Sequence, residues 1–179
     1  MQKVVSISQL ITSIKDSEWK AIDQILENLA IPLEAFDEFQ KWKTEGYSRN
    51  YIYKSEEFEL LLVCWNKNDA SVIHDHGGQK CWVYQLDGEI MENRYELDDN
   101  LNLKSTMNHV YKKGDYSFMD ESMGFHNLAN TSAGRAMTLH VYMSPILSCN
   151  VYDSGACMVS HKNLDCQSEN NNEVVFNSN

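Results

Sequence analysis

Phe-Glu-Leu-Leu-Leu-Val-Cys-Trp, at residues 58–65, is an almost unbroken apolar run with the length of one β-strand. It follows Tyr51, where the apolar pattern changes to a period of two, which is typical of extended chain. Further strand-like runs follow around residues 81–86, 89–96, 104–111 and 135–143. Turn residues separate them, and Asp87-Gly88 predicts a two-residue β-hairpin. Several short strands with almost no helical pattern between them predict a mainly β fold, either a barrel or a sandwich.

The first 45 residues have a different pattern, because apolar residues recur there at spacings of three and four, as in amphipathic helices. We expect three helical segments, with the apolar stripes Ile7, Leu10 and Ile11; Trp19, Ile22, Ile25, Leu26 and Leu29; and Leu33, Phe36 and Phe39. The end of the chain is polar and rich in Asn and Ser. The sequence therefore predicts one domain at residues 1–165, with a helical cap at 1–45 and a β-barrel at 46–165, followed by a polar tail at 166–179.

The composition argues against two classes of partner. The chain has 26 acidic and 15 basic residues, so its formal net charge is −11. This charge repels nucleic-acid phosphates and anionic membrane surfaces, and we expect neither as a partner. The five cysteines include no Cys-x-x-Cys pair, and the N-terminus lacks the segments of a signal peptide. We expect a monomer in the reducing cytoplasm.

Two histidines stand in the strand-like run at residues 71–76. His74 and His76 are two residues apart, so they project from the same face of an extended chain, whereas Asp75 projects from the other face. Two neutral imidazoles held together suit Fe, Zn, Cu or Ni. The alternative is a pair of surface histidines on an edge strand. A third histidine about fifty residues later, His126, favours the metal site.

The spacing around these histidines resembles the two motifs of the cupin superfamily. His74-x-His76, four residues, Cys81, six residues and Gly88 is similar to the first motif, with Cys81 where many cupins have a ligating Glu. His126 stands where the second motif has its histidine. The resemblance implies a jelly-roll-like β-barrel that holds a metal.

From about Tyr47 to Cys149 the chain resembles the cysteine dioxygenase family more specifically. The matching strings are Tyr47-Ser48-Arg49-Asn50, Cys64-Trp65, Ile73-His74-Asp75-His76, Cys81, Gly124-Phe125-His126 and Thr138-Leu139-His140-Val141-Tyr142. The resemblance implies a non-haem iron dioxygenase that oxidises the thiol of free L-cysteine with O2. The product would be cysteine sulfinic acid, formed in cysteine catabolism by the sulfinate and taurine route.

The resemblance implies that His74, His76 and His126 hold Fe(II) and that Arg49 binds the substrate carboxylate. Three histidines give the metal no negative charge, and a substrate thiolate would supply it. We therefore expect cysteine to chelate the iron through sulfur and amine and to leave a position for O2. A guanidinium suits a carboxylate because it makes two parallel hydrogen bonds, and Tyr47, two residues away, would project toward the same pocket. Without the resemblance, Arg49 reads more simply as a solvated surface residue.

The resemblance also implies a thioether bond between Cys81 and Tyr142, which acts as a protein-derived cofactor, with Trp65 as a pocket wall. His140 would orient the Tyr142 hydroxyl group, and Thr138 would extend the same hydrogen-bonded row. These residues also have an ordinary interpretation as core side chains, Cys81 as a small apolar group and His140 and Tyr142 as buried polar groups with satisfied hydrogen bonds.

Two other functions stay open. One is a dioxygenase for 3-mercaptopropionate or another small thiol, and Arg49 argues against it because relatives of that type usually have Gln there. The other is a cupin that binds a metal without catalysis, and O2 consumption would distinguish it from an enzyme. Three histidines also suit zinc, so iron is inferred from the resemblance.

Overall fold

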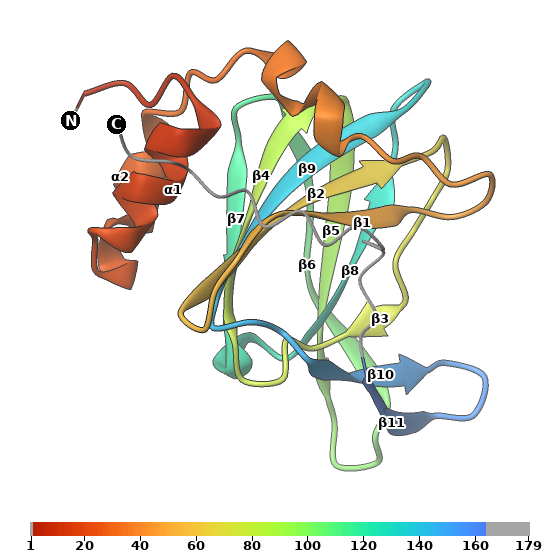
Figure 1. Cartoon of the computed structure of the whole chain (residues 1–179). Coiled ribbons are helices and arrows are strands. Elements are labelled where there is room, and N and C mark those ends of the chain that lie inside the picture. Colours follow the sequence, from red (N-terminus) through yellow and green to blue (C-terminus); the bar gives the residue numbers. More distant parts are fainter. Residues whose placement is uncertain (1, 164–179) are drawn as a thin grey trace.

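The computed structural model describes residues 2–163. Its N-terminal part contains helix α1 (Ile7–Lys15), the 3-10 helix η1 (Trp19–Ala21), helix α2 (Ile22–Glu27) and the 3-10 helix η2 (Leu33–Phe39). Helices α1 and α2 lie together at one side of the strands, and η2, drawn in orange, lies at the top of the view (Figure 1). The helical character predicted for residues 1–45 is confirmed, although the third segment is a 3-10 helix. The tail expected at residues 166–179 lies outside the described residues.

The rest of the described chain is mainly β. Its strands are β1 (Ser48–Lys54), β2 (Phe58–Trp65), β3 (Ile73–His74), β4 (Lys80–Asp87), β5 (Glu89–Leu97), β6 (Leu103–Lys112), β7 (Tyr116–Met119), β8 (Phe125–Asn130), β9 (Ala136–Met143), β10 (Ser148–Asp153) and β11 (Met158–Asn163), with a 3-10 turn η3 (Glu121–Met123). They form a five-stranded sheet, in the order β1-β2-β9-β4-β7, and a six-stranded sheet, in the order β11-β10-β3-β8-β5-β6. The predicted mainly β fold with an N-terminal helical cap is confirmed. Within residues 2–163 the two sheets remain separate in their strand pairing and do not close into one continuous barrel.

Strand β2, the stretch with the continuous apolar run, is buried along its whole length. Leu60 and Leu62 pack in one core cluster with residues of the N-terminal helices, such as Leu10 and Ile25. Their neighbours on the opposite face belong to a second cluster, which lies between the sheets. A strand that is covered on both faces needs apolar residues at every position, which explains why residues 58–65 lack the usual alternation.

Gly88 marks a sharp corner between the two sheets. The predicted two-residue hairpin at Asp87-Gly88 is wrong, because β4 pairs with β7 and β9, whereas β5 pairs with β6 and β8. Gly88 has φ +77°, and a Cβ atom there would lie 2.7 Å from the Cβ of Ala136 and 2.7 Å from Oγ of Ser132. Only glycine lets the chain turn through this crowded position into the other sheet.

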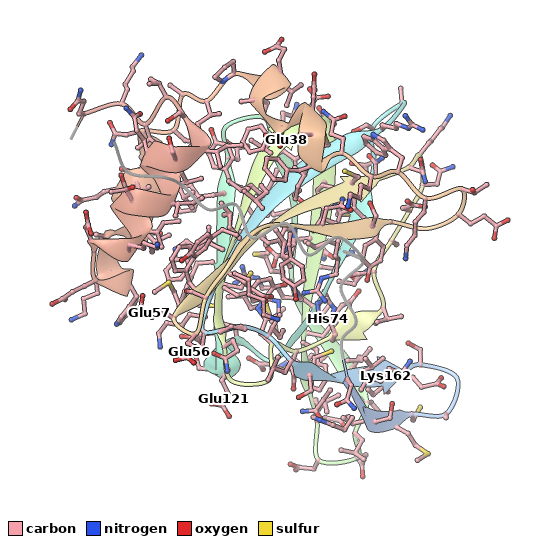
Figure 2. All side chains as sticks on the ribbon, viewed as in Figure 1. Glu38, Glu56, Glu57, His74, Glu121 and Lys162 are labelled. Atoms are coloured by element: carbon pink, nitrogen blue, oxygen red, sulfur yellow. The ribbon has the colours of Figure 1, made fainter. Side chains whose placement is uncertain are left out.

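Several acidic side chains lie on the outside of the molecule. Figure 2 labels Glu38, Glu56, Glu57 and Glu121, all of which are exposed, and shows His74 in the interior between the sheets. Within residues 2–163, no helix combines the length and the apolar character that crossing a membrane requires.

Candidate metal and substrate site

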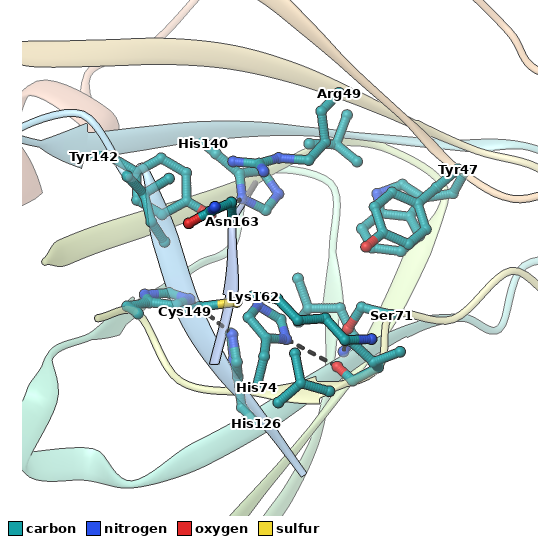
Figure 3. Close-up of a pocket in the computed structure, with 17 residues that line it drawn as sticks. Tyr47, Arg49, Ser71, His74, His126, His140, Tyr142, Cys149, Lys162 and Asn163 are labelled. Atoms are coloured by element: carbon teal, nitrogen blue, oxygen red, sulfur yellow. Dashed lines mark hydrogen bonds between the residues drawn. The ribbon is translucent and has the colours of Figure 1, made fainter. Parts of the chain in front are cut away.

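A cavity of about 110 Å³ lies between the two sheets (Figure 3). A single water needs roughly 10–15 Å³ on the same measure, so the cavity can hold a small molecule but not a peptide segment. Eight of the predicted site residues line it, namely Tyr47, Arg49, Trp65, His74, His76, His126, His140 and Tyr142. Cys81 does not line the cavity, since it is fully buried in the wall.

His74, His76 and His126 present ligand nitrogens that all lie within 4.8 Å of one another. Nε2 of His76 lies 2.9 Å from Nε2 of His126. Burial and the neighbouring His126 lower the pKa of His74 to about 3, and burial with the neighbouring histidines lowers the pKa of His76 well below its usual value. Neutral imidazole is the form that binds metals, so these three side chains fit a divalent transition metal.

Strand pairing and one backbone hydrogen bond orient two of these ligands. His74 in β3 is directly opposite His126 in β8, so both imidazoles leave the same face of the six-stranded sheet. Nδ1 of His74 donates to the backbone carbonyl of Val72 over 2.8 Å, which leaves Nε2 as the ligand atom. Such a bond from the second ring nitrogen commonly fixes the tautomer and the ring orientation of a metal ligand.

His76 lies in a loop rather than in the strand predicted at residues 71–76, because β3 contains only Ile73 and His74. Asp75 holds this loop against β10: its carboxylate accepts hydrogen bonds from the backbone N–H of Asn150 at 2.8 Å, the side-chain amide of Asn150 at 2.7 Å and the backbone N–H of Gly77 at 3.0 Å. Asp75 is therefore occupied away from the three imidazoles, and no sequence pattern indicated its contact with β10.

A buried carboxylate that the sequence analysis missed supports His126. Nδ1 of His126 donates to Oε1 of Glu92 over 2.7 Å, and the other oxygen of Glu92 accepts from Ser117 at 2.6 Å and from Arg94 at 3.2 Å. Burial acts to raise the pKa of Glu92, but the hydrogen bond and charge interaction with His126, together with the hydrogen bonds from Ser117 and Arg94, lower it to about 2. Glu92 thus brings a negative charge next to a set of neutral ligands. The sequence held one indication that Glu92 is buried, because it lies two residues after Ile90 and so on the same inward face of β5.

A row of hydrogen bonds leads from Trp65 to Tyr142 along the inner face of β9. The indole N–H of Trp65 donates to Oγ1 of Thr138 at 2.9 Å, and Oγ1 of Thr138 lies 2.9 Å from Nε2 of His140. Nδ1 of His140 lies 3.5 Å from the Tyr142 hydroxyl group. The structure therefore places Thr138 and His140 in the row that was expected, and Trp65 anchors it as well as walling the cavity.

Cys81 and Tyr142 occupy directly opposite positions on the adjacent strands β4 and β9. Side chains opposite each other on one face of an antiparallel pair have their Cβ atoms about 4.5–5.5 Å apart. Burial raises the pKa of the Cys81 thiol, and a hydrogen bond with Tyr142 opposes that effect. Burial also raises the pKa of Tyr142, with Cys81 adding to it. The two groups are therefore close, dry and uncharged, with the phenol on the cavity side.

Arg49 and Tyr47 both reach the cavity from the five-stranded side, as their spacing predicted. The Arg49 guanidinium lies 5.9 Å from the centre of the Tyr142 ring, and Nη2 lies 3.9 Å from a carboxylate oxygen of Glu59. The Tyr47 ring stacks on Trp65, with ring centres 4.6 Å apart. Arg49 thus brings a positive charge to the wall of the cavity that also holds the three histidines.

Other residues line the cavity without having been predicted to do so. Among them, Cys149 is buried and faces the cavity, and Lys162 and Asn163 reach it from β11 (Figure 3). No sequence pattern marked the last two, because only the pairing of β11 with β10 brings them to the site.

Comparisons with known proteins agree with this architecture. Residues 2–155 match the family model for cysteine dioxygenase type I. The chain is 26% identical to the cysteine dioxygenase type 1 of Danio rerio over 137 residues, which cover 74% of this chain and 68% of the relative. It is also 26% identical to that of Homo sapiens over 129 residues, which cover 70% of this chain and just under two thirds, 63%, of the human protein.

Solved structures show the fold alone. A structure from Thermus thermophilus has a TM-score of 0.51 and 20% identity, and it covers 61% of this chain and 93% of its own. A Klebsiella pneumoniae protein with a double-stranded β-helix domain has a TM-score of 0.51 and 12% identity, covering 60% and 80%. Because the family match runs from residue 2 to residue 155, through the helices and every residue of the cavity wall predicted above, the chain belongs to the cysteine dioxygenase type I family.

Proposed function

We propose that this protein oxidises the thiol of free L-cysteine with O2 to cysteine sulfinic acid. The observation that carries the proposal is the position of Arg49 on the wall of the same small cavity as His74, His76 and His126. These three imidazoles would hold Fe(II), which supplies a redox-active centre for both the thiolate and O2 when it is bound. The family membership supports this choice of metal and reaction.

Arg49 selects the substrate in this scheme. Its guanidinium can bind a carboxylate through two charge-assisted hydrogen bonds, which fixes the distance of the thiol from the histidines. Tyr47, stacked on Trp65, lines the side of the cavity near Arg49 and limits its width. Apolar side chains, among them Val63 and Leu128, complete the lining and exclude water from the reacting sulfur.

We propose that the phenol of Tyr142 lies beside the thiol of the substrate and orients it. The row from Trp65 through Thr138 and His140 can hold the phenol oxygen in place, because each member fixes the next through a hydrogen bond. We further propose that Cys81 becomes joined to the Tyr142 ring by a thioether bond, which would remove one rotational freedom of the phenol.

We place the reaction in the cytoplasm. The four cysteines within residues 2–163, Cys64, Cys81, Cys149 and Cys157, are all free thiols, and a free thiol substrate also requires a reducing compartment.

Oxygen uptake by Fe(II)-loaded protein tests the proposal. With L-cysteine we expect O2 to be consumed in equal amount to the cysteine sulfinic acid formed, and metal-free or Zn-loaded protein should show no uptake. The Arg49→Gln variant should raise KM for L-cysteine about 10- to 100-fold, since it loses a hydrogen bond to a charged group, and it should have little effect on any turnover of cysteamine, which has no carboxylate.

Two results would contradict the proposal. An absence of uptake with fully iron-loaded protein would leave a metal-binding module without this activity. A higher kcat/KM with 3-mercaptopropionate than with L-cysteine would make the protein a dioxygenase for a different small thiol.

A further inference from the structure

Glu59 is a carboxylate in the interior with no assigned role. It lies on β2, opposite Tyr142 on β9, and its side chain is completely inaccessible to solvent. It shares its face of β2 with Leu61 and Val63, which belong to the core between the sheets. Neither of its carboxylate oxygens has a hydrogen-bond partner of normal geometry among the described residues. A buried charge in such surroundings is costly unless another charge compensates it.

The compensating charge is Arg49, whose Nη2 lies 3.9 Å from Oε1 of Glu59. Arg49 lines the cavity and Glu59 does not, so the guanidinium has the cavity to one side and a carboxylate within ion-pair distance in the wall. Burial raises the pKa of Glu59, and Arg49, followed by the more distant Lys54 and the backbone N–H of Ile146, acts to lower it. At 3.9 Å the contact is an ion pair without a hydrogen bond, so it changes the potential at Arg49 more than it fixes the orientation of the guanidinium.

We propose that Glu59 is the internal counter-ion of Arg49 and thereby determines specificity, because it weakens the binding of thiols that carry a carboxylate and leaves thiols without one unaffected. A substrate carboxylate must share the guanidinium with Glu59, and in a partly dehydrated site two like charges on one cation oppose each other. The inference rests on the proposed function of Arg49 as the carboxylate-binding residue.

Anaerobic ligand binding to Co(II)-loaded protein tests this proposal without requiring catalysis. The absorption of the thiolate-to-cobalt contact reports binding of L-cysteine, 3-mercaptopropionate and cysteamine. We expect the Glu59→Gln variant to lower Kd for the first two ligands about tenfold and to leave Kd for cysteamine unchanged. Glu59→Asp keeps the charge and Glu59→Asn removes it at the same length, so this second pair should show the same contrast, whether or not the Gln variant folds.

A second substitution at Arg49 tests whether Glu59 changes Kd through Arg49. In an Arg49→Gln background, Glu59→Gln should no longer change Kd for cysteine, because the two substitutions act through one ion pair. A Tm at or above that of the wild type would show that the neutral variants are intact.

The proposal is overturned if the neutral variants bind cysteine equally well or more weakly, if cysteamine gains as much as cysteine, or if the gain persists without Arg49. A lack of cysteine and 3-mercaptopropionate binding to the wild type would also overturn it, together with the role of Arg49. A protein that shows the expected pattern of Kd values but consumes no O2 would retain this inference and lose the proposed function.

Discussion

The carboxylate of Glu92 shows how much a metal site depends on residues that do not touch the metal. The three imidazoles carry no charge in their ligand form, and they differ in the hydrogen bond that Nδ1 makes. In His74 it donates to a backbone carbonyl, and in His126 it donates to Glu92. Nδ1 of His76 has no hydrogen-bond partner within the described residues. Only Glu92 adds negative charge. An anion at the second ring nitrogen makes an imidazole a stronger donor, so we expect His126 to be the most tightly held ligand.

Glu92→Gln should weaken metal affinity about 10- to 100-fold, since His126 would lose its charged partner. Competition for Co(II) or Zn(II) against a chelating dye measures this without any turnover. Glu96→Gln, an exposed position on the same strand, is the matched control and should leave affinity unchanged. Equal affinities in the two variants would show that Glu92 has only a packing role.

At this scale the sequence predicted the residues that resemble known motifs and missed the ones that support them. The spacing of His74, His76 and His126 was readable because it brings like residues together. Glu59 and Glu92 were not, because a glutamate usually faces solvent, whether it interrupts an apolar run, as Glu59 does, or stands among other charged residues, as Glu92 does. Their burial follows from which sheet covers them, and that is a property of the tertiary structure.

Among the elements, the pairing of β4 with β9 is the one with a chemical consequence. It puts Cys81 opposite Tyr142, and it puts Tyr142 between Cys81 and Glu59 in one row across three strands. Each strand is buried along most of its length, so the register cannot slip without moving every inward side chain to the other face. The contact between thiol and phenol is therefore a fixed feature of the sheet.

Fe(II)-loaded protein that has turned over cysteine with O2 should contain a species lighter by two hydrogens, which corresponds to the thioether between Cys81 and Tyr142. Intact-protein mass spectrometry after treatment with a reductant detects it. The species should be absent from Cys81→Ser and present in Cys149→Ser, which removes the other thiol of the site. Its absence from the wild type after prolonged turnover, or its persistence in Cys81→Ser, would be contrary to this assignment.

The strands that the sequence predicted are those with strong apolar patterns, and the missed ones have weak patterns. Strands β2, β4, β5, β6 and β9 lie where they were expected, within one or two residues. Strand β11 is mostly exposed and has too little apolar character to be recognised, whereas β3 has only two residues and lies within the longer strand predicted at residues 71–76. These two form part of the six-stranded sheet only because longer strands are already there to pair with.

For the molecule as a whole, the two sheets are positioned by corners where the chain leaves one sheet and enters the other. Gly88 is such a corner. The sequence marked it as a turn but could not distinguish a hairpin from a change of sheet, since the same two residues serve both, and the difference lies in which distant strands pair with β4 and β5.

Gly88→Ala should lower the free energy of unfolding by about 2–4 kcal/mol, because alanine at positive φ is strained and its Cβ would press against Ala136. Denaturant unfolding measures the loss. Gly134→Ala is the control, since a Cβ there meets nothing within 4 Å, and it should change stability by less than about 1 kcal/mol. Similar losses in both variants would mean that the corner tolerates a side chain.

The two sheets also divide the site between them. His74 and His126 belong to the six-stranded sheet, whereas Arg49, Glu59 and Tyr142 belong to the five-stranded sheet. Mutations on β1 and β2 can therefore alter which small thiol binds as substrate while the metal ligands keep their geometry. A lineage with this fold can acquire a new substrate one strand at a time, and no ancestor along the way needs to rebuild its metal centre.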